Sequence, residues 1–197
     1  HDGHTAMLLG AARHLAGQRD FDGTVVLVFQ PAEEVLDFNK QDGTSRGGAV
    51  AMLKAGFLER FPVDSMFGMH NRPGLPAGSF HSKAGPAYAA VDRFEISIDG
   101  KGGHAARPHQ CLDPITASAQ LILALQTIAS RVVDPFMPVV VSICQTAGGS
   151  NFNIIPDTVH LTGTVRAFDE HARSLVQNTM ERICGGIEIA SACAIRL

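Results

Sequence analysis

The stretch from Thr24 to Glu34 constrains the fold of this chain more than any other. A continuous, valine-rich apolar run of strand length leads through Pro31 into two adjacent glutamates, Glu33 and Glu34. Such a run is typical of a buried central strand in a parallel sheet. Pro31 lacks a backbone donor and therefore ends regular strand pairing. We predict a buried strand over residues 24–30, with both glutamates beyond its carboxyl end.

The glutamate pair would then lie where open α/β sheets place their ligands. Neighbouring side chains of an extended segment point in opposite directions. One carboxylate can therefore bind a cation while the other faces the molecule that the cation holds. The alternative is a solvated loop carrying two surface charges, because glutamate side chains are mostly exposed in proteins.

Composition narrows the class of protein. The chain has 197 residues, of which 45% are hydrophobic and 18% charged, so it is globular and long enough for one large or two small domains. Its net charge of -3 argues against a nucleic-acid partner. We find no apolar run that suggests a membrane span. Four cysteines without a C-x-x-C pair indicate reduced thiols of an intracellular, cytoplasmic protein: Cys111, Cys144, Cys184 and Cys193.

Histidines gather at two places in the first part of the chain. His1 and His4 open a segment with helical spacing that stops near Gly17, which indicates either metal or anion binding, or simply a polar helix entry. His70 ends a second apolar run, residues 65–70, and repeats the pattern of a strand followed by a ligand-type residue. His70 lies 36 positions after Glu34, too far for a local hairpin, so the two meet only if their strands lie near each other in one sheet. A lone histidine at a strand end is more often structural.

The remainder of the chain has a different pattern of apolar and polar residues, and we place a domain boundary near residue 87. Alternation and helical stripes predict, in order, a strand at 94–99, a helix at 114–132, strands at 138–145 and 159–165, a helix capped by Asp169, and a last strand within 192–197. A further helix is expected at 47–55 and a short edge strand at 79–86. The order strand, helix, strand, strand, helix, strand is that of a ferredoxin-like module, which leaves an edge available for a second copy.

Six short motifs occur in one order along the chain: His1-Asp2-Gly3-His4-Thr5-Ala6, Gln30-Pro31-Ala32-Glu33-Glu34, Gly68-Met69-His70-Asn71, Gly102-Gly103-His104-Ala105, Asn153-Ile154-Ile155-Pro156 and Gly163-Thr164-Val165-Arg166. Through them the chain resembles the metal-dependent amidohydrolases of the aminoacylase and carboxypeptidase superfamily. The resembling branch contains hippurate hydrolase, N-acyl-amino-acid amidohydrolase and auxin-conjugate hydrolase. The resemblance covers essentially the whole chain.

The resemblance implies an α/β fold in two parts. Residues 1–87 would be a partial catalytic α/β sheet domain, and residues 88–197 a ferredoxin-like α+β lid that also forms a homodimer. It further implies a binuclear, metallopeptidase-like site for two divalent metal ions, zinc or manganese. Its implied metal ligands in this chain are His1, Glu34 and His70.

The resemblance also implies roles around the metals. Glu33 would be the general base, and His104 would reach a neighbouring subunit's site and stabilise the oxyanion. Asn153 and Arg166 would contact the substrate carboxylate. His4 is expected to assist the metal region from beside it, whereas the remaining histidines are expected to be surface or structural residues.

Two departures from the family pattern stand out. The family has a cysteine ligand two positions before the residue matching His1 and a last histidine ligand on a returning catalytic segment. This chain therefore supplies three of the five metal-binding residues, and we expect it to be a fragment of a longer protein. The segment Val35–Arg46 is also longer and less glycine-rich than the usual loop after the glutamate pair, so it is expected either to shape the pocket or to be disordered, and substrate specificity stays open.

The expected function is metal-dependent hydrolysis of the amide bond of small N-acyl amino acids, which releases a carboxylic acid and a free amino acid. One alternative is a metallo-exopeptidase, a dipeptidase or carboxypeptidase, with the same site. A second alternative is a non-catalytic dimerising fragment, because an incomplete ligand set cannot hold two metals well.

Overall fold

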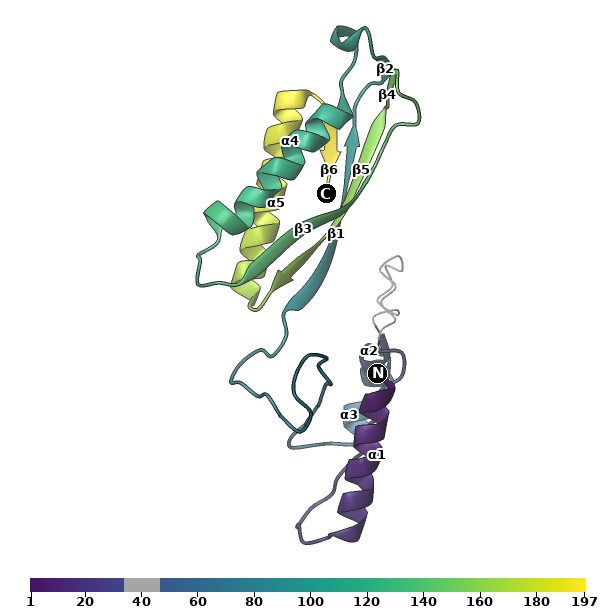
Figure 1. The fold of residues 1–197 in the computed structure, drawn as a ribbon, viewed down its shortest axis with the longest axis vertical. Coiled ribbons are helices and arrows are strands. Elements are labelled where there is room, and N and C mark those ends of the chain that lie inside the picture. Colours follow the sequence, from purple (N-terminus) through teal and green to yellow (C-terminus); the bar gives the residue numbers. More distant parts are fainter. Residues whose placement is uncertain (34–46) are drawn as a thin grey trace. The chain divides into compact units, whose positions relative to one another are not determined.

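The computed structural model describes residues 1–33 and 47–197, which form two compact units, His1–Phe80 and His81–Leu197 (Figure 1). Glu34, predicted to be a metal ligand, and the segment Val35–Arg46, predicted to shape the pocket, lie outside the described residues. The division into two units is a structural fact. The boundary near residue 87, with a catalytic part before it and a lid after it, stays a prediction.

The described residues of the first unit form three helices, with irregular segments beside them. They are α1 (Asp2–Gly17), α2 (Gly47–Lys54) and α3 (Phe57–Arg60). The predicted stop of the first helix at Gly17 is confirmed, and the predicted helix at 47–55 is confirmed to within one residue. His1 is the N-cap of α1, so the helix begins directly at the first histidine motif.

Three predicted strands of this part of the chain are wrong. Residues 24–30, 65–70 and 79–86 are extended or irregular, and none belongs to a sheet. The run over 24–30 is also not buried, since Val25, Leu27 and Phe29 are 49%, 39% and 47% exposed. A strand needs a neighbour to hydrogen-bond with. The described residues of this unit offer no partner strand, which explains why an apolar run with the right pattern stays unpaired.

The segment that leads into the glutamate pair is held by the start of α2. The Gly48 amide donates to the carbonyl of Ala32 at 3.3 Å. A Cβ atom on Gly48 would lie only 1.6 Å from the carbonyl oxygen of Pro31, so only glycine allows this close approach. The backbone before Glu33 is therefore fixed against α2.

The second unit contains a four-stranded antiparallel sheet in the order β3-β5-β1-β6 (Figure 1). Its strands are β1 (Ala90–Asp99), β3 (Val139–Ala147), β5 (Thr158–Ala167) and β6 (Ala194–Arg196). β1 and β5 pair along their whole length, from Ala90 opposite Ala167 to Asp99 opposite Thr158. A separate two-stranded ladder joins β2 (Gly103–His104) to β4 (Ile154–Ile155).

Two long helices cover one face of this sheet. They are α4 (Pro114–Thr127), which continues as the π-helical turn η2 (Ile128–Val132), and α5 (Glu170–Ser191); the short 3₁₀ helix η1 (Pro108–Gln110) precedes α4 (Figure 1). The cap predicted at Asp169 is confirmed, because its carboxylate accepts the Ala172 amide at 2.8 Å. Asp113 caps α4 in the same way.

The core of the second unit lies between these helices and the sheet. The predicted alternation of β1 and β5 and the stripes of both helices are confirmed by buried side chains, among them Phe94, Ile96, Ile98, Leu121, Leu125, Ile128, Val159, Leu161, Val165, Val176 and Met180. The four cysteines are free thiols, and burial raises the pKa of Cys184 to about 11, so this thiol stays protonated.

We expected no apolar run that suggests a membrane span, but one helix passes that test. The segment Pro114–Val132 is long and apolar enough to cross a membrane by length and composition alone. Its stripe of Leu121, Leu125 and Ile128 is fully buried in the core, which is typical of a core helix in a globular domain.

Candidate metal centre and lid loop

Three histidines from distant parts of the first unit converge at the start of α1. Ligand atoms of His1, His4 and His70 all lie within 4.8 Å of one another. The rings of His1 and His4 stack with centroids 4.7 Å apart, and the His70 ring lies edge-on to both, at 5.3 Å from His1 and 4.3 Å from His4.

Helix geometry explains the first half of this cluster. Residues three apart lie on the same face of an α-helix, so the first turn of α1 brings His4 next to His1. His70 is brought to the cluster by its neighbour Asn71, whose backbone amide lies 3.0 Å from the His4 Nε2 atom. The Asn71 side-chain oxygen lies 2.8 Å from the same nitrogen. These contacts join segments 67 residues apart in the sequence.

Glu33 lies beside the cluster. Its Oε2 atom is 3.0 Å from His1 Nδ1, and both side chains are partly exposed. A carboxylate that accepts from one imidazole nitrogen fixes the proton there and leaves the lone pair on the other nitrogen. Glu33 therefore selects the tautomer of His1 whose Nε2 can act as a ligand atom.

The donor set fits a transition-metal ion. Imidazole nitrogens and carboxylates are the ligands that zinc and manganese use in proteins, and a zinc–nitrogen bond is about 2.0–2.1 Å long. The ligand atoms of these histidines lie within 4.8 Å of one another, so the three rings gather around one candidate cation site. Histidine nitrogens with a carboxylate beside them are thus suited to hold a metal, and Glu33 and the backbone of Asn71 are placed to orient two of these rings.

His104 lies in the second unit, on β2, opposite Ile154 of β4. Its Nδ1 atom accepts the amide of Ala106 at 3.1 Å, which places the ring proton on Nε2. The side chain is exposed, so this nitrogen is a donor presented at the surface. Asn153 is held next to it, because its carbonyl accepts the Ala105 amide at 3.0 Å.

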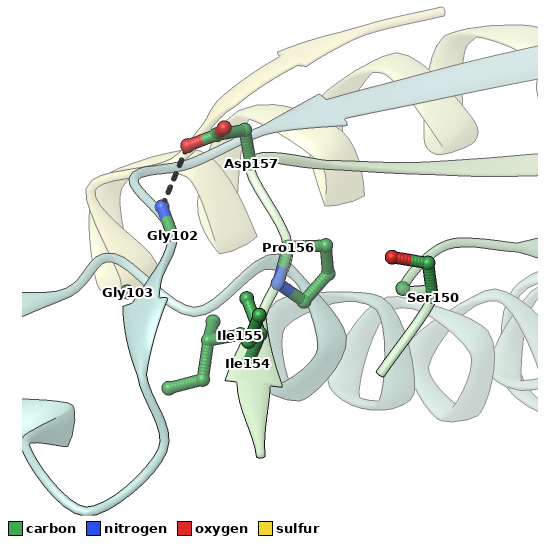
Figure 2. Close-up of a pocket in the computed structure, with 8 residues that line it drawn as sticks. Gly102, Gly103, Ser150, Ile154, Ile155, Pro156 and Asp157 are labelled. Atoms are coloured by element: carbon green, nitrogen blue, oxygen red, sulfur yellow. Dashed lines mark hydrogen bonds between the residues drawn. The ribbon is translucent and has the colours of Figure 1, made fainter. Parts of the chain in front are cut away.

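A glycine-rich depression adjoins this ladder. It has a volume of about 530 Å³ and is lined by Gly102, Gly103, Gly149, Ser150, Ile154, Ile155, Pro156 and Asp157 (Figure 2). Figure 2 also shows Asp157 accepting the Gly102 amide, at 2.9 Å. A Cβ atom on Gly102 would lie 2.4 Å from the Ile155 carbonyl oxygen, so glycine is required for the two segments to approach. That approach sets the ladder that presents His104.

Arg166 lies on β5 of the four-stranded sheet, near the end of the strand that is farther from the β2–β4 ladder. It is exposed on the face of β5 that the helices do not cover, paired in register with Val91 and Val140. Eight residues of strand separate it from Thr158, which corresponds to roughly 26 Å. The β2–β4 ladder with Asn153 lies beyond the Thr158 end of β5 (Figure 1). Asn153 and Arg166 of one chain are therefore too far apart to contact one small carboxylate.

The structure thus brings together three of the predicted residues, His1, Glu33 and His70, in the first unit, and His104 with Asn153 in the second. The contribution of Asn71 to the first group is the part that sequence reasoning did not specify, whereas His4 was expected to assist the metal region from beside it. A signal for it was present, since His1 and His4 are one helical turn apart and Asn71 directly follows His70. The roles of all these residues stay predictions.

Comparison with known proteins places these features in a family. The model of peptidase family M20/M25/M40 matches residues 1–188. The chain is 44% identical over 188 residues to the N-acetylcysteine deacetylase of Bacillus subtilis, covering 95% of this chain and 46% of that protein. It is 43% identical over 197 residues to the hippurate hydrolase of Campylobacter jejuni, covering 100% of this chain and 49% of that protein.

Solved structures agree with the sequence relatives. The crystal structure of the Bacillus subtilis YXEP protein, described as a dinuclear metal-binding peptidase, matches with a TM-score of 0.74 and 38% identity over 98% of this chain and 45% of that one. The chain spans about half the length of the curated relatives it matches. The match to the family model extends from the histidine cluster through β1, β3, β5 and α4 and into α5, and on this ground the chain belongs to peptidase family M20/M25/M40.

Proposed function

We propose that this chain carries the metal-binding and lid parts of an amidohydrolase that cleaves small N-acyl amino acids into a carboxylic acid and a free amino acid. The observation that carries the proposal is the convergence of His1, His4 and His70 with the Glu33 carboxylate. The deacetylase and hydrolase names of the relatives support an N-acyl amino acid as substrate. The sequence predictions of a cytoplasmic location and of no nucleic-acid or membrane partner accompany this proposal.

We infer that His1 and His70, with Glu34, hold two divalent metal ions, zinc or manganese. Bound there, the cations would supply Lewis acidity, which polarises the scissile carbonyl and lowers the pKa of water from ~16 to about 7. Glu33 is within reach of His1 and carries an acceptor carboxylate. It would take the proton from the attacking water and return it to the leaving amine.

The second unit supports the predicted role of a ferredoxin-like lid. Its elements follow the order strand, helix, strand, strand, helix, strand, the main sheet has the order β3-β5-β1-β6, and both long helices lie on one face. That combination matches a split βαβ module. His104 presents its Nε2 donor on a loop of this unit, where it would stabilise the oxyanion.

The two ends of the lid sheet favour a homodimer with shared sites. Arg166 lies near one end of the sheet, and Asn153 with His104 lies beyond the other. One small substrate cannot reach both ends of the sheet. If all three residues contact substrate, Arg166 and the His104–Asn153 pair of one chain must therefore contact two different substrate molecules. We propose that each site takes Arg166 from one subunit and His104 with Asn153 from its partner. The guanidinium of Arg166 would then bind the substrate carboxylate through its planar fork.

The direct test of the hydrolase proposal is Glu33→Gln in the full-length protein. The amide oxygen of glutamine can still accept from His1, so we expect the bound metal content to stay close to that of the wild type. A glutamine cannot take up a proton, so kcat should fall by about 10²- to 10⁴-fold. Glu59→Gln on α3 removes an exposed carboxylate of the same unit and is the matched control. Near-full activity of Glu33→Gln would remove Glu33 as the base.

A metallo-exopeptidase with the same site is the second candidate, because the matched family is one of peptidases. A panel of N-acetyl and N-benzoyl amino acids, compared with dipeptides of the same C-terminal residue, separates the two. A higher kcat/KM for the acylated amino acids supports the amidohydrolase. A preference for the dipeptides, whose acyl group carries a free α-amino group, would assign the exopeptidase.

A further inference from the structure

We propose that His4 is a positioning residue for His70, acting through the backbone of Asn71. The proposal rests on the proposed metal centre, since it concerns how one of its histidines is held. Neither the predicted ligand set nor the predicted catalytic groups include His4, although its ring lies closer to that of His70 than the His1 ring does, at 4.3 Å against 5.3 Å.

The backbone of Asn71 connects the rings of His4 and His70 through two hydrogen bonds. Its amide bonds one ring and its carbonyl bonds the other. The Asn71 amide, which can only donate, lies 3.0 Å from His4 Nε2. The Asn71 carbonyl, which can only accept, lies 2.6 Å from His70 Nδ1. His70 therefore carries its ring proton on Nδ1, and its lone pair is on Nε2. His4 holds the backbone turn that makes this arrangement possible.

The same contacts argue that His4 itself is not a ligand through Nε2. The lone pair of that nitrogen already accepts the Asn71 backbone amide at 3.0 Å. A metal ion at this atom would have to displace the turn that carries His70. The turn is also accommodated closely, since a Cβ atom on Gly3 would lie 3.4 Å from the Asn71 side-chain nitrogen.

Helix geometry explains why a histidine suits this position. The first turn of α1 is fixed in direction by the helix, and His4 is half-buried, whereas His1 and His70 are exposed. A ring anchored on a helix can hold an irregular segment that has no strand partner. This is the role that a neighbouring hydrogen-bond partner plays around many metal-bound histidines, where its loss typically costs 10- to 100-fold in metal affinity.

The test measures Co²⁺ binding to the full-length protein, by competition with a chelator and by the visible absorption spectrum. We expect His4→Ala to weaken Co²⁺ affinity by about 10- to 100-fold. At saturating Co²⁺ its spectrum should keep the wild-type intensity, because the ligand set is unchanged. His4→Gln keeps an acceptor for the Asn71 amide and should restore much of the affinity. His14→Ala, an exposed histidine near the end of the same helix, is the matched control and should bind like the wild type.

Two further variants separate the possible routes. Asn71→Ala keeps the backbone amide and carbonyl, so it should retain most of the affinity if the route is through the backbone. In a His70→Ala background, adding His4→Ala should cost little more, because a positioning residue has no effect once the group it positions is gone. Additive losses, or a changed spectrum at saturation, would instead make His4 a metal ligand and overturn the proposal.

These readouts do not depend on hydrolysis. If the protein binds Co²⁺ but cleaves no N-acyl amino acid, the proposed function fails while the positioning role can still be confirmed. If His4→Ala binds Co²⁺ as tightly as the wild type and remains folded by circular dichroism, the positioning role is overturned, whatever the activity. If His4→Ala does not fold, His4→Gln is compared with the wild type instead. A loss of Co²⁺ affinity in His4→Gln as large as that in His70→Ala would also contradict the proposal.

Discussion

Single histidines in this chain differ in the nitrogen that carries the proton, and this difference decides what each can do. His70 donates from Nδ1 to the Asn71 carbonyl, which leaves the Nε2 lone pair to act as a ligand. His104 accepts at Nδ1 from the Ala106 amide, which leaves Nε2–H to act as a donor. The first arrangement suits a cation and the second suits an oxyanion. Local backbone contacts thus leave a lone pair on Nε2 of one ring and an N–H on Nε2 of the other.

The donor role of His104 leads to a test at the same scale. His104→Ala in the full-length protein should lower kcat by about 10²- to 10³-fold, the usual cost of removing one oxyanion donor. Metal content should be unchanged, because His104 lies on the loop of the second unit and not in the histidine cluster. His109→Ala in η1, an exposed histidine nearby in the sequence, should leave kcat unaffected. Loss of metal from His104→Ala, measured by elemental analysis, would contradict the assignment.

The carboxylate of Asp99 on β1 contacts residues of two neighbouring strands, β5 and β6. Asp99 accepts from Thr158 at 2.9 Å and forms an ion pair with Arg196 of β6. The hydrogen bond from Thr158, together with Arg196, holds the pKa of the Asp99 carboxyl below its usual value. One aspartate therefore connects the ends of β1, β5 and β6 at the edge of the sheet nearest the β2–β4 ladder.

At the scale of the element, α4 offers a sharp test of the packing. Leu121 is fully buried against the sheet, whereas Leu123, two residues on, is 72% exposed. Leu121→Ala should lower the free energy of unfolding by about 2–5 kcal/mol, because it removes buried methyl groups and leaves a cavity. Leu123→Ala should change it by less than about 0.5 kcal/mol. Urea unfolding of both variants checks this, and similar losses from the two would mean that α4 packs by a different face.

Elements of the second unit could be predicted from the sequence because each has its partners within the described chain. The alternation around Phe94, Ile96 and Ile98 has a matching strand in β5, and the stripe of α4 has a sheet to cover. The run over 24–30 carries an equally strong strand pattern but finds no neighbouring strand among the described residues of its unit. Periodicity reports which face a segment would bury, and it does not report whether a partner is there to bury it.

The site could be predicted in part for a related reason. Position after an apolar run drew attention to Glu33 and His70, but the alternatives of a solvated loop and a structural histidine stayed open until the family resemblance implied roles for His1, Glu33 and His70, which the structure brings together. The contacts through Asn71 could not be derived, because they depend on backbone groups that every residue carries. The separation of Asn153 from Arg166 also needs the sheet, since a spacing along the chain does not tell which end of a strand faces the substrate.

At the scale of the whole molecule, the sheet of the second unit limits how many chains build one site. Arg166 and Asn153 lie at or beyond opposite ends of β5, a strand roughly 26 Å long between Thr158 and Arg166. A small N-acyl amino acid cannot span that distance. If both residues bind substrate, a C₂ dimer in which each lid contributes to two sites is the simplest arrangement that uses them.

Mixing two inactive full-length variants tests this arrangement. In a heterodimer of Arg166→Ala with Asn153→Ala, one site carries both changes and the other carries neither. Random pairing makes half of the dimers mixed, so co-refolded protein should recover about a quarter of wild-type activity. Mixing Asn153→Ala with His104→Ala is the matched control. Both residues come from the same partner subunit in this scheme, so every site keeps one defect and no activity should return. Recovery in the second mixture but not in the first, or in neither, would show that the sites are not shared in this way.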